Sequence, residues 1–303
     1  MFPFKQRGLW GFINATGDII VRPTFDYASY EQEAHCVVKR NGRAGFINNK
    51  GELTVPLVFD IARDFSEGYA PVKKDGYWGF VTPSGDMKIK LQYELVLNFS
   101  EGLCAVKVDR KWGYIDRTEK LRIHHLYSEV SLFRNDRAFF KVKEFKKKGY
   151  IDREGNEIIV NPRYLIGTVY SGGVASAIFD GKFGFIDLDG NMTISPSFES
   201  VGFFSEGLAS VKMNGLYGYI DINGNVKIHP KYEYASEFKD GIAYVTQGEK
   251  IGFISKTGEY IIEPQYDDID SLSFGRELVN VRLGNEIKYI NILNNEHVFS
   301  YQR

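Results

Sequence analysis

The sequence predicts an all-β protein built from tandem repeats. Three observations favour this class. A glycine followed by Phe or Tyr recurs about every 34 residues, turn residues and a short alternating run follow each copy, and no stretch shows a helical hydrophobic period of useful length. The steps between successive copies are 34, 34, 34, 36, 35, 34 and 34 residues. The recurring glycines are Gly11, Gly45, Gly79, Gly113, Gly149, Gly184, Gly218 and Gly252.

Each copy begins with a predicted strand around its glycine. The clearest example is KWGYID, Lys111 to Asp116, in which large side chains alternate along the chain. A glycine inside a strand indicates that another backbone approaches closely at that point. Copies two, five and eight depart from the pattern and carry Ala44, Lys148 and Ile251 before the glycine. The large aromatic residues before the other glycines are Trp10, Trp78, Trp112, Phe183 and Tyr217.

A turn and a second strand follow. The turn has a polar residue first and a glycine last, as in Asn14 to Gly17. The polar side chain can cap the turn and the glycine can adopt a positive φ, which is typical of a hairpin. The second strand runs into a proline, which has no N–H for a ladder and therefore either closes the strand or leaves it at a sheet edge. These prolines are Pro23, Pro56, Pro162, Pro196, Pro230 and Pro264.

A third strand, such as Leu208 to Lys212, completes the predicted unit of three antiparallel strands. A sheet this small is marginal alone, so we expect neighbouring copies to bury each other's aromatic residues. We predict one array over residues 1–303, with a cap strand at 1–7, eight repeats of about 34 residues at 8–286, and a degenerate cap repeat at 287–303. An open, twisted or superhelical array is favoured because end repeats drift from the consensus. A closed β-propeller is the alternative.

Composition narrows the functional classes. The chain has 38 basic and 39 acidic residues, so its formal net charge of -1 creates no global field that would attract nucleic acid or an anionic membrane. We expect no membrane partner and a cytoplasmic location, because no leader or long apolar run is visible. The only cysteines, Cys36 and Cys104, occupy a third-strand position where other copies carry alanine, which predicts small buried side chains and no disulfide.

The pattern resembles the WG-repeat family of bacterial proteins, also called KWG repeats. The matching features are KWGYID, the turn glycine, the aromatic and acidic pair after a proline at Pro264 to Asp267, and Phe-Ser-Glu-Gly-Leu-Ala at Phe204 to Ala209. The resemblance covers residues 8 to 291 and weakens in repeats four and five. It implies a β-rich repeat array used for interaction, and it implies no common enzymatic reaction.

Catalytic and metal sites find little support. Asp187-Leu188-Asp189-Gly190 looks like the start of a calcium loop, but the twelfth position, which should be glutamate, is Phe198. His124 and His125 are adjacent on a strand and so face opposite sides. No phosphate loop, and no nucleophile placed beside a base, is visible. We therefore expect no metal, no cofactor and no enzymatic activity, and a hydrolase or transferase is the least favoured alternative.

Basic residues form two predicted features. One is a column at the end of the third strand, formed by Lys39, Lys73, Lys107, Lys143, Lys212 and Arg282, which we interpret as a solvated face that could also follow an anionic partner. The other is the irregular region 120–153, where ten basic residues oppose four acidic ones and the hairpin from Phe145 to Lys148 is predicted to project. The candidate binding residues there are Arg134, Arg137, Lys141, Lys143, Phe145, Lys146, Lys147 and Lys148.

These observations predict a non-catalytic protein-protein interaction or scaffold module. Its preferred contact is the basic region of repeats four and five. The alternative is binding of a nucleic acid, a nucleotide or another anionic ligand through the same residues. Residues 233 to 270, by contrast, hold nine carboxylates and three lysines, so the chain is polarised although nearly neutral.

Overall fold

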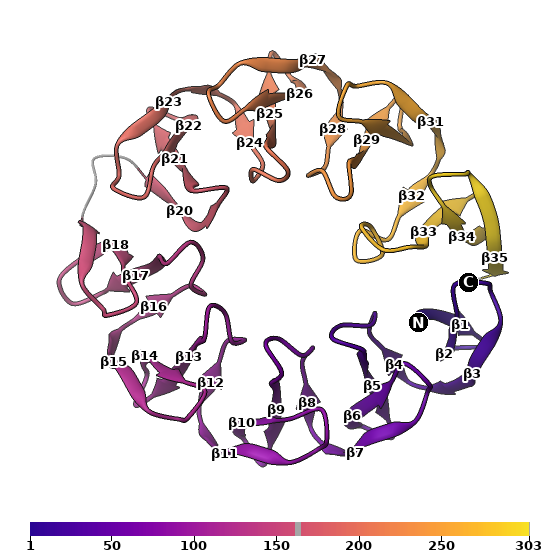
Figure 1. Ribbon diagram of the computed structural model, residues 1–303, viewed down its shortest axis with the longest axis horizontal. Helices are drawn as coiled ribbons and strands as arrows, with labels where there is room; N and C mark the ends of the chain where they lie inside the picture. Colours follow the sequence, from indigo (N-terminus) through magenta and orange to yellow (C-terminus); the bar gives the residue numbers. More distant parts are fainter. Residues whose placement is uncertain (161–164, 303) are drawn as a thin grey trace. The chain divides into compact units, whose positions relative to one another are not determined.

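The computed structural model describes residues 1–160 and 165–302, and the regular elements in these ranges are antiparallel β-strands. They form nine sheets (Figure 1). Two compact units divide the chain, Met1–Glu157 and Ile158–Gln302. The described residues contain no helix long and apolar enough to cross a membrane. Pro162, one of the predicted strand-ending prolines, lies outside the described residues.

The first unit opens with a three-stranded sheet and continues with four-stranded sheets. The opening sheet is β1 (Phe2–Gln6), β2 (Leu9–Ile13) and β3 (Ile19–Phe25). The second is β4 (Tyr27–Ala28), β5 (His35–Arg40), β6 (Arg43–Asn48) and β7 (Leu53–Phe59), and the third is β8 (Ile61–Ala62), β9 (Ala70–Lys74), β10 (Tyr77–Val81) and β11 (Met87–Tyr93). The fourth is β12 (Leu95–Val96), β13 (Leu103–Val108), β14 (Lys111–Asp116) and β15 (Leu121–Tyr127). The fifth is β16 (Glu129–Val130), β17 (Ala138–Val142), β18 (Lys147–Ile151) and β19 (Glu157–Val160), and the boundary between the units falls within β19.

The second unit contains four further four-stranded sheets. They are β20 (Leu165–Ser171), β21 (Val174–Phe179), β22 (Lys182–Ile186) and β23 (Met192–Phe198), then β24 (Ser200–Val201), β25 (Leu208–Met213), β26 (Leu216–Asp221) and β27 (Val226–Tyr232). After these come β28 (Tyr234–Ala235), β29 (Ile242–Gln247), β30 (Lys250–Ser255) and β31 (Tyr260–Tyr266). The last sheet is β32 (Asp268–Ile269), β33 (Val279–Leu283), β34 (Glu286–Asn291) and β35 (Glu296–Gln302).

Each four-stranded sheet is a blade of a β-propeller, so the prediction of an open superhelical array of three-stranded repeats is wrong. The predicted unit lacked the first strand, which in most blades has only two residues. In blade β4–β7, for example, Tyr27 pairs with Lys39 and Ala28 with Val38. Two residues are too few to show an alternating pattern, so this strand leaves no signal in the sequence. Within each unit the blades follow an arc, with these first strands on its concave side (Figure 1).

In five sheets the last strand, an edge strand, continues through one of the predicted prolines, Pro23, Pro56, Pro196, Pro230 or Pro264. Strand β3 includes Pro23 and pairs only with β2, and β27 likewise includes Pro230 and pairs only with β26. The missing proline N–H therefore costs no ladder bond. The sequence analysis left two options for these prolines. The prediction that the strand lies at a sheet edge is confirmed, and the prediction that the strand ends at the proline is wrong.

The glycine of the repeat lies at a β-bulge. Between β14 and β15 the register shifts between Trp112 and Tyr114, which flank Gly113. A Cβ atom added to Gly113 would lie 2.6 Å from the carbonyl oxygen of Ile123, closer than real Cβ contacts occur. The predicted close backbone approach is confirmed. KWGYID is therefore a structural element, in which Asp116 also caps the following turn by accepting hydrogen bonds from the backbone N–H groups of Thr118 and Lys120.

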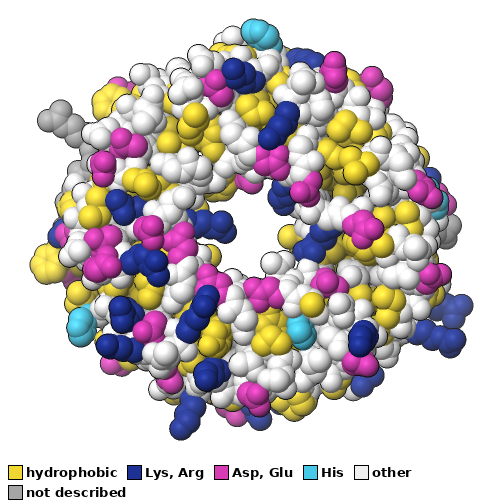
Figure 2. Space-filling view, in the orientation of Figure 1, with side chains coloured by type: hydrophobic (Ala, Val, Ile, Leu, Met, Phe, Trp, Pro, Cys, Tyr) yellow, Lys and Arg dark blue, Asp and Glu magenta, His cyan; other side chains and the backbone are white. Residues whose placement is uncertain are grey.

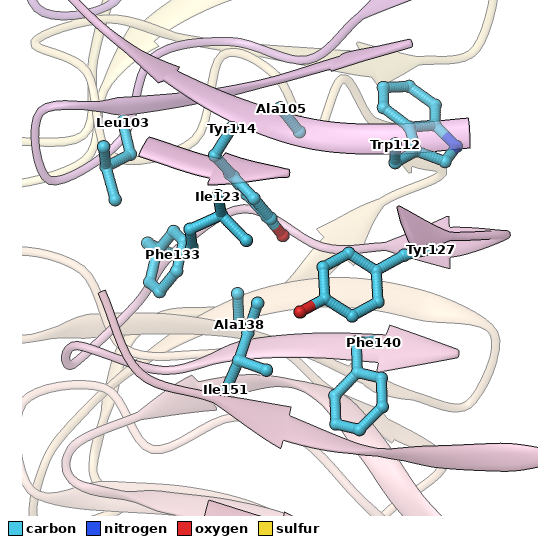
Figure 3. Packing of buried hydrophobic residues seen from close by; sticks show 10 residues of the cluster. All are labelled: Leu103, Ala105, Trp112, Tyr114, Ile123, Tyr127, Phe133, Ala138, Phe140 and Ile151. Carbon is cyan, nitrogen blue, oxygen red and sulfur yellow. The ribbon is translucent and has the colours of Figure 1, made fainter. Parts of the chain in front are cut away.

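The core lies between neighbouring blades, as the sequence predicted. In Figure 3, Tyr114 and Tyr127 of blade β12–β15 face Phe133 and Phe140 of the next blade, and Trp112 belongs to the same buried cluster. The ring centroids of Tyr114 and Phe133 are 4.9 Å apart, and Tyr114 donates a hydrogen bond across the interface to the carbonyl oxygen of Ser131. Burial of each such aromatic side chain contributes about 1.5–3 kcal/mol. No blade could bury these rings alone.

Candidate functional site

The predicted basic site does not form one patch. Arg134 and Arg137 pair with each other in the loop between β16 and β17. The turn at Lys143 to Lys146 lies at the other end of β17, a strand of five residues. At roughly 3.3 Å per residue, the two groups are on the order of 15 Å apart. One ligand group cannot contact both.

Several of these cations also have acidic partners. Lys141 forms an ion pair with Glu129 at 3.3 Å, and Lys147 pairs with Glu157. Lys147 and Lys148 belong to strand β18, so the prediction that they project at the hairpin tip is wrong; the turn consists of Lys143 to Lys146. Phe145 in that turn is 79% exposed. On the face shown in Figure 2, acidic and basic side chains are interspersed.

The predicted basic column has a structural role in several blades. Lys107 pairs with Trp112 across the hairpin and its Nζ lies 5.7 Å from the centroid of the indole ring. The same arrangement recurs for Lys5 over Trp10, Lys73 over Trp78 and Lys212 over Tyr217, at 5.5, 6.0 and 5.5 Å. Cation–π contacts therefore hold these lysines within their own blades.

One member of that column was assigned to the wrong residue. In the fifth sheet, Lys141 pairs with Lys148, which stands directly before the repeat glycine. Lys141, and not Lys143, is therefore the equivalent of Lys107. The cause is the longer hairpin, which shifted the sequence alignment by two positions.

The Asp187 turn has no structural sign of a metal site. Its Oδ1 accepts hydrogen bonds from the backbone N–H groups of Asp189 and Asn191 at 3.0 and 2.8 Å, which is the capping role that the turn needs. Burial alone would raise the pKa of Asp187, but the hydrogen bonds outweigh it and hold the pKa below its usual value. Within residues 1–160 and 165–302, no cluster of three His, Cys, Asp or Glu side chains could hold a metal ion.

A cavity of about 440 Å³ in the second unit is the candidate site. Three consecutive blades contribute to it, and several of its residues come from the two-residue strands β24 and β28 on the concave side of the unit. The lining residues are Ser200, Val201, Gly202, Ser210, Tyr217, Tyr234, Ala235, Ser236, Glu237, Lys239, Tyr244, Ser271 and Phe274.

Small residues in blade β24–β27 open this cavity. In blade β12–β15, Leu95 and Leu97 pack against the core cluster that contains Trp112. The residues at the same places in blade β24–β27 are Ser200 and Gly202, as the pairing with the neighbouring strand shows. Two large side chains are thus replaced by a hydroxymethyl group and a hydrogen atom. The space that they would fill remains open above Tyr217.

Aromatic rings form one wall. The ring of Tyr234 lies 6.0 Å from that of Tyr217 and is stacked on that of Tyr244 at 5.7 Å with an interplanar angle of 26°. Tyr244 also meets Phe274 edge to face at 5.0 Å. Burial raises the pKa of Tyr244, and hydrogen bonding to Tyr234 together with the nearby charge of Glu237 raises it further. Tyr244 is therefore neutral at physiological pH.

Polar groups lie beside the rings. The Ser210 side chain lines the cavity from a residue that is only 4% exposed, and its hydroxyl has no hydrogen-bond partner among the described residues. The hydroxyl of Ser236, in contrast, donates to the carbonyl oxygen of Glu237 and accepts from the N–H of Tyr244. Lys239 donates to the carbonyl oxygen of Phe274 at 3.3 Å. Among the described residues, Nε2 of His125 is the only buried side-chain N or O atom without a partner, so the Ser210 hydroxyl is open to the cavity and available to water or a ligand there.

A second cavity of about 270 Å³ adjoins the first through Lys239 and Phe274. Its other lining residues are Asp240, Ile242, Gly275, Arg276, Glu277, Asn291, Ile292 and Leu293. No histidine or cysteine is among the described residues that line either cavity, and the hydroxyl of Ser236 donates to a backbone carbonyl rather than to a base. The arrangement has the character of a binding site: flat apolar faces with a few polar groups beside them.

Fold and site together define a β-propeller repeat protein with a cavity lined in part by aromatic side chains. The family model for WG-containing repeats matches the chain seven times, and the chain belongs to this family. The matches cover residues 10–43, 45–78, 78–112, 112–144, 183–217, 217–250 and 251–285. They omit residues 145–182, where the repeat is most irregular. The predicted resemblance is confirmed.

Solved structures support the fold assignment. The crystal structure of a eukaryotic initiation factor is similar, with a TM-score of 0.68, 10% sequence identity, and coverage of 99% of this chain and 95% of that one. The dihydro-heme d1 dehydrogenase NirN in complex with DHE has a TM-score of 0.51 at 11% identity, with coverage of 93% and 75%. Both are β-propellers, and at these identities the likeness concerns the fold alone. A search of curated proteins found no match.

Sequence reasoning missed most of the cavity. Tyr217 was predicted only as a packing residue, and none of the small residues around it was singled out. A usable signal existed in the repeat itself, because Ser200 and Gly202 stand where blade β12–β15 has leucines. The repeat glycines already align Leu97 with Gly202, which stand at the same distance before Gly113 and Gly218, but only the structure shows that this position lies beside the aromatic ring.

Proposed function

We propose that the protein is a non-catalytic interaction module that binds an extended segment of another protein in the cavity of the second unit. The cavity itself carries the proposal: an aromatic wall, a hydroxyl without a protein partner and a half-buried carboxylate, beside exposed apolar side chains. Tyr234 at the cavity is 45% exposed, and Leu272, next to the lining residue Ser271, is 71% exposed. Exposed apolar groups around a concave site are typical of protein-binding surfaces.

A protein partner fits the charges better than a nucleic acid does. The candidate cations for nucleic-acid binding lie at two ends of β17, and Lys141 and Lys147 already have carboxylate partners. The stretch that contains part of the cavity, residues 233 to 270, is rich in carboxylates. A polyphosphate chain would be repelled there, whereas a basic or neutral peptide would not.

The proposal can be tested with a variant whose cavity is filled. Gly202→Leu combined with Ser210→Ala copies Leu97 and Ala105 of blade β12–β15. The alanine removes the hydroxyl that a new Cβ at position 202 would meet at 2.5 Å. Random peptides of about 12 residues, long enough to cross the site in an extended form, would be selected by phage display on the wild-type protein. Synthetic versions would then be titrated by calorimetry against both proteins.

We expect selected peptides to bind the filled variant at least about tenfold more weakly, a loss of about 1.4 kcal/mol. Circular dichroism and urea unfolding would confirm that the variant is folded. Failure to select any peptide, or equal binding to both proteins, would overturn the proposal. A labelled single-stranded DNA of about 20 nucleotides tests the alternative. Binding that falls steeply with salt and with Lys143→Glu and Lys146→Glu would favour nucleic acid instead.

A further inference from the structure

We infer that the cavity receives the guanidinium group of an arginine side chain from the partner, stacked on Tyr217. This inference rests on the proposed function, because it names the group that the peptide would insert. The evidence comes from another blade of the same chain, in which an arginine of the protein already occupies the corresponding place.

That arginine is Arg63, in blade β8–β11. Its guanidinium carbon lies 4.2 Å from the centroid of the Trp78 ring, and its Nη1 donates a hydrogen bond to the carbonyl oxygen of Val96 at 2.9 Å. Val96 belongs to the two-residue strand of the next blade. A planar cation is thus held between an aromatic face and a backbone acceptor, an arrangement that suits arginine.

Gly202 is the equivalent of Arg63. The backbone N–H of Arg63 donates to the carbonyl oxygen of Pro71, and that of Gly202 donates to the carbonyl oxygen of Ser210 in the same way. The equivalent of Trp78 is Tyr217, because each pairs with a lysine in the second strand of its blade, Lys73 in β9 and Lys212 in β25. The cavity therefore lies where a side chain at position 202 would extend, over the ring of Tyr217.

The backbone acceptor has an equivalent as well. Ala235 holds the place in β28 that Val96 holds in β12, and it lines the cavity. The hydroxyl of Ser210, which has no partner among the described residues, adds a second acceptor. Since a guanidinium group has five N–H donors in one plane, it can use both of these acceptors while it stacks.

The charges around the cavity agree with a cation. Glu237 corresponds to the neutral Asn98, which lies two residues after Val96 in the Arg63 arrangement. The charge of Glu237 is close enough to raise the pKa of Tyr244 further, beyond the effect of burial. The cation that also lines the cavity, Lys239, is bound to the carbonyl oxygen of Phe274 and lies 5.8 Å from the centroid of that ring.

The lysine already above the ring does not block the site. Nζ of Lys212 is 5.5 Å from the centroid of Tyr217. In blade β8–β11 the equivalent Lys73 is 6.0 Å from Trp78 while Arg63 also contacts that ring. The two cations thus coexist in the same chain.

The probe is N-acetyl-arginine amide, titrated into the ¹⁵N-labelled protein of residues 1–303 and followed by amide chemical shifts. We expect saturable shifts at Gly202, Tyr217 and Ala235, with a dissociation constant on the order of 1 mM. N-acetyl-citrulline amide, which has the same shape without the charge, and N-acetyl-lysine amide should bind at least about tenfold more weakly. A compact ammonium group is strongly hydrated and cannot stack as guanidinium does.

Two variants complete the test. Gly202→Arg with Ser210→Ala should supply its own guanidinium group and abolish the shifts. Glu237→Gln, which leaves the packing intact, should weaken binding of the arginine probe and leave that of the citrulline probe unchanged. Equal binding of the three probes, or unchanged binding to the Gly202→Arg protein, would overturn the inference.

The outcomes for the inference and for the proposed function can be told apart. If selected peptides bind the cavity but contain no arginine, the guanidinium assignment fails while the proposed function stands. If the arginine probe binds and no peptide can be selected, the proposed function fails instead.

Discussion

The carboxylate of Glu33 accepts hydrogen bonds from the backbone N–H groups of Glu67 and Gly68 in the following blade, at 2.6 and 2.9 Å. The two donors point to one place because Glu67 and Gly68 both have positive φ, 55° and 80°. Successive N–H groups in this conformation form a concave anion site. Here the anion is a side chain of the neighbouring blade.

The contact repeats along the chain. Glu67 accepts from the N–H of Gly102 at 2.9 Å, and Glu206 accepts from that of Gly241 at 3.0 Å. Glu101 likewise binds the N–H groups of Asn135 and Asp136. The glutamate of the Phe-Ser-Glu-Gly element, or the glutamate in its place at position 33, therefore connects neighbouring blades by accepting hydrogen bonds from backbone N–H groups at the same turn of the next blade.

Acid should weaken these connectors. Burial raises the pKa of Glu67, but hydrogen bonds from Arg117 and Gly102 outweigh it, so the pKa is lowered in the folded state. The pKa of Glu206 is lowered in the same way, because hydrogen bonds from Lys256 and Gly241 outweigh its burial. A carboxylate with a lowered folded pKa contributes stability above its unfolded pKa of about 4.3, and this contribution is lost as the pH falls through the folded value.

We therefore expect Glu67→Gln to lower the free energy of unfolding by about 1–2 kcal/mol at pH 7. The difference from wild type should shrink as the pH falls below about 4. Urea unfolding at several pH values would measure it. Glu154→Gln, at an exposed turn position, is the control and should change little at any pH. A difference that is the same in neutral and in strongly acidic buffer would contradict this account.

The second prediction concerns Trp112, which is 7% exposed in the core cluster of blade β12–β15. Trp112→Ala should lower the free energy of unfolding by about 3–5 kcal/mol, because it removes a buried ring and leaves a cavity. Phe145→Ala, at a residue 79% exposed, should change it by less than about 0.5 kcal/mol. Denaturant titration followed by circular dichroism would compare the two. Unchanged stability with loss of peptide binding would show that Trp112 is a recognition residue.

The sequence predicted those features that depend on one residue type in one local conformation. Gly113 could be predicted as a close approach because no other residue fits a bulge at that distance, and the Asn14 turn because a polar cap and a positive-φ glycine occur together. Two-residue strands such as Ile61–Ala62 could not be predicted from the sequence, since two residues are too few to show an alternating pattern. They form only because the next strand offers an unpaired edge.

The candidate site was beyond sequence reasoning for a related reason. The site was predicted at Lys146 and its neighbours because basic residues cluster there in the sequence. Whether such a lysine can bind a ligand depends on its ion-pair partners in the fold, such as Glu157 for Lys147. The cavity above Tyr217 arises because Gly202 has no side chain to fill it. An absent side chain leaves no charge or motif of its own, and its consequence becomes clear only when the structure shows that Leu97, at the same place in blade β12–β15, packs against the cluster that contains Trp112.

The third prediction separates two glycines by what surrounds them. Gly113→Ala would place a Cβ 2.6 Å from a backbone carbonyl oxygen, whereas Gly202→Ala would meet the Ser210 hydroxyl, a side-chain atom that can rotate away. We expect Gly113→Ala to destabilise the protein by about 1–3 kcal/mol or more, because the β14–β15 ladder must shift. Gly202→Ala should cost less than about 1 kcal/mol. Equal midpoints in thermal unfolding of the two variants would refute the role given to the repeat glycine.

The last prediction concerns the two cysteines. Both Cys36 and Cys104 are 0% exposed, which confirms the predicted small core side chains. Burial raises the pKa of the Cys104 thiol well above its usual value. The S–H group donates to the carbonyl oxygen of Leu97 at 3.3 Å. Since the thiolate is the reactive form, we expect neither thiol to react with Ellman's reagent at about pH 8 in the native protein.

Both thiols should react after unfolding in guanidinium chloride. Cys104→Ala should remain folded and able to bind peptides, because other blades have Ala70 and Ala209 at this position. Rapid labelling of the native wild type that disappears in Cys104→Ala would contradict this expectation, because it would mean that the Cys104 position opens to solvent. The packing between blades β8–β11 and β12–β15 would then have to be looser than the buried cluster of Trp78, Phe99 and Cys104 indicates.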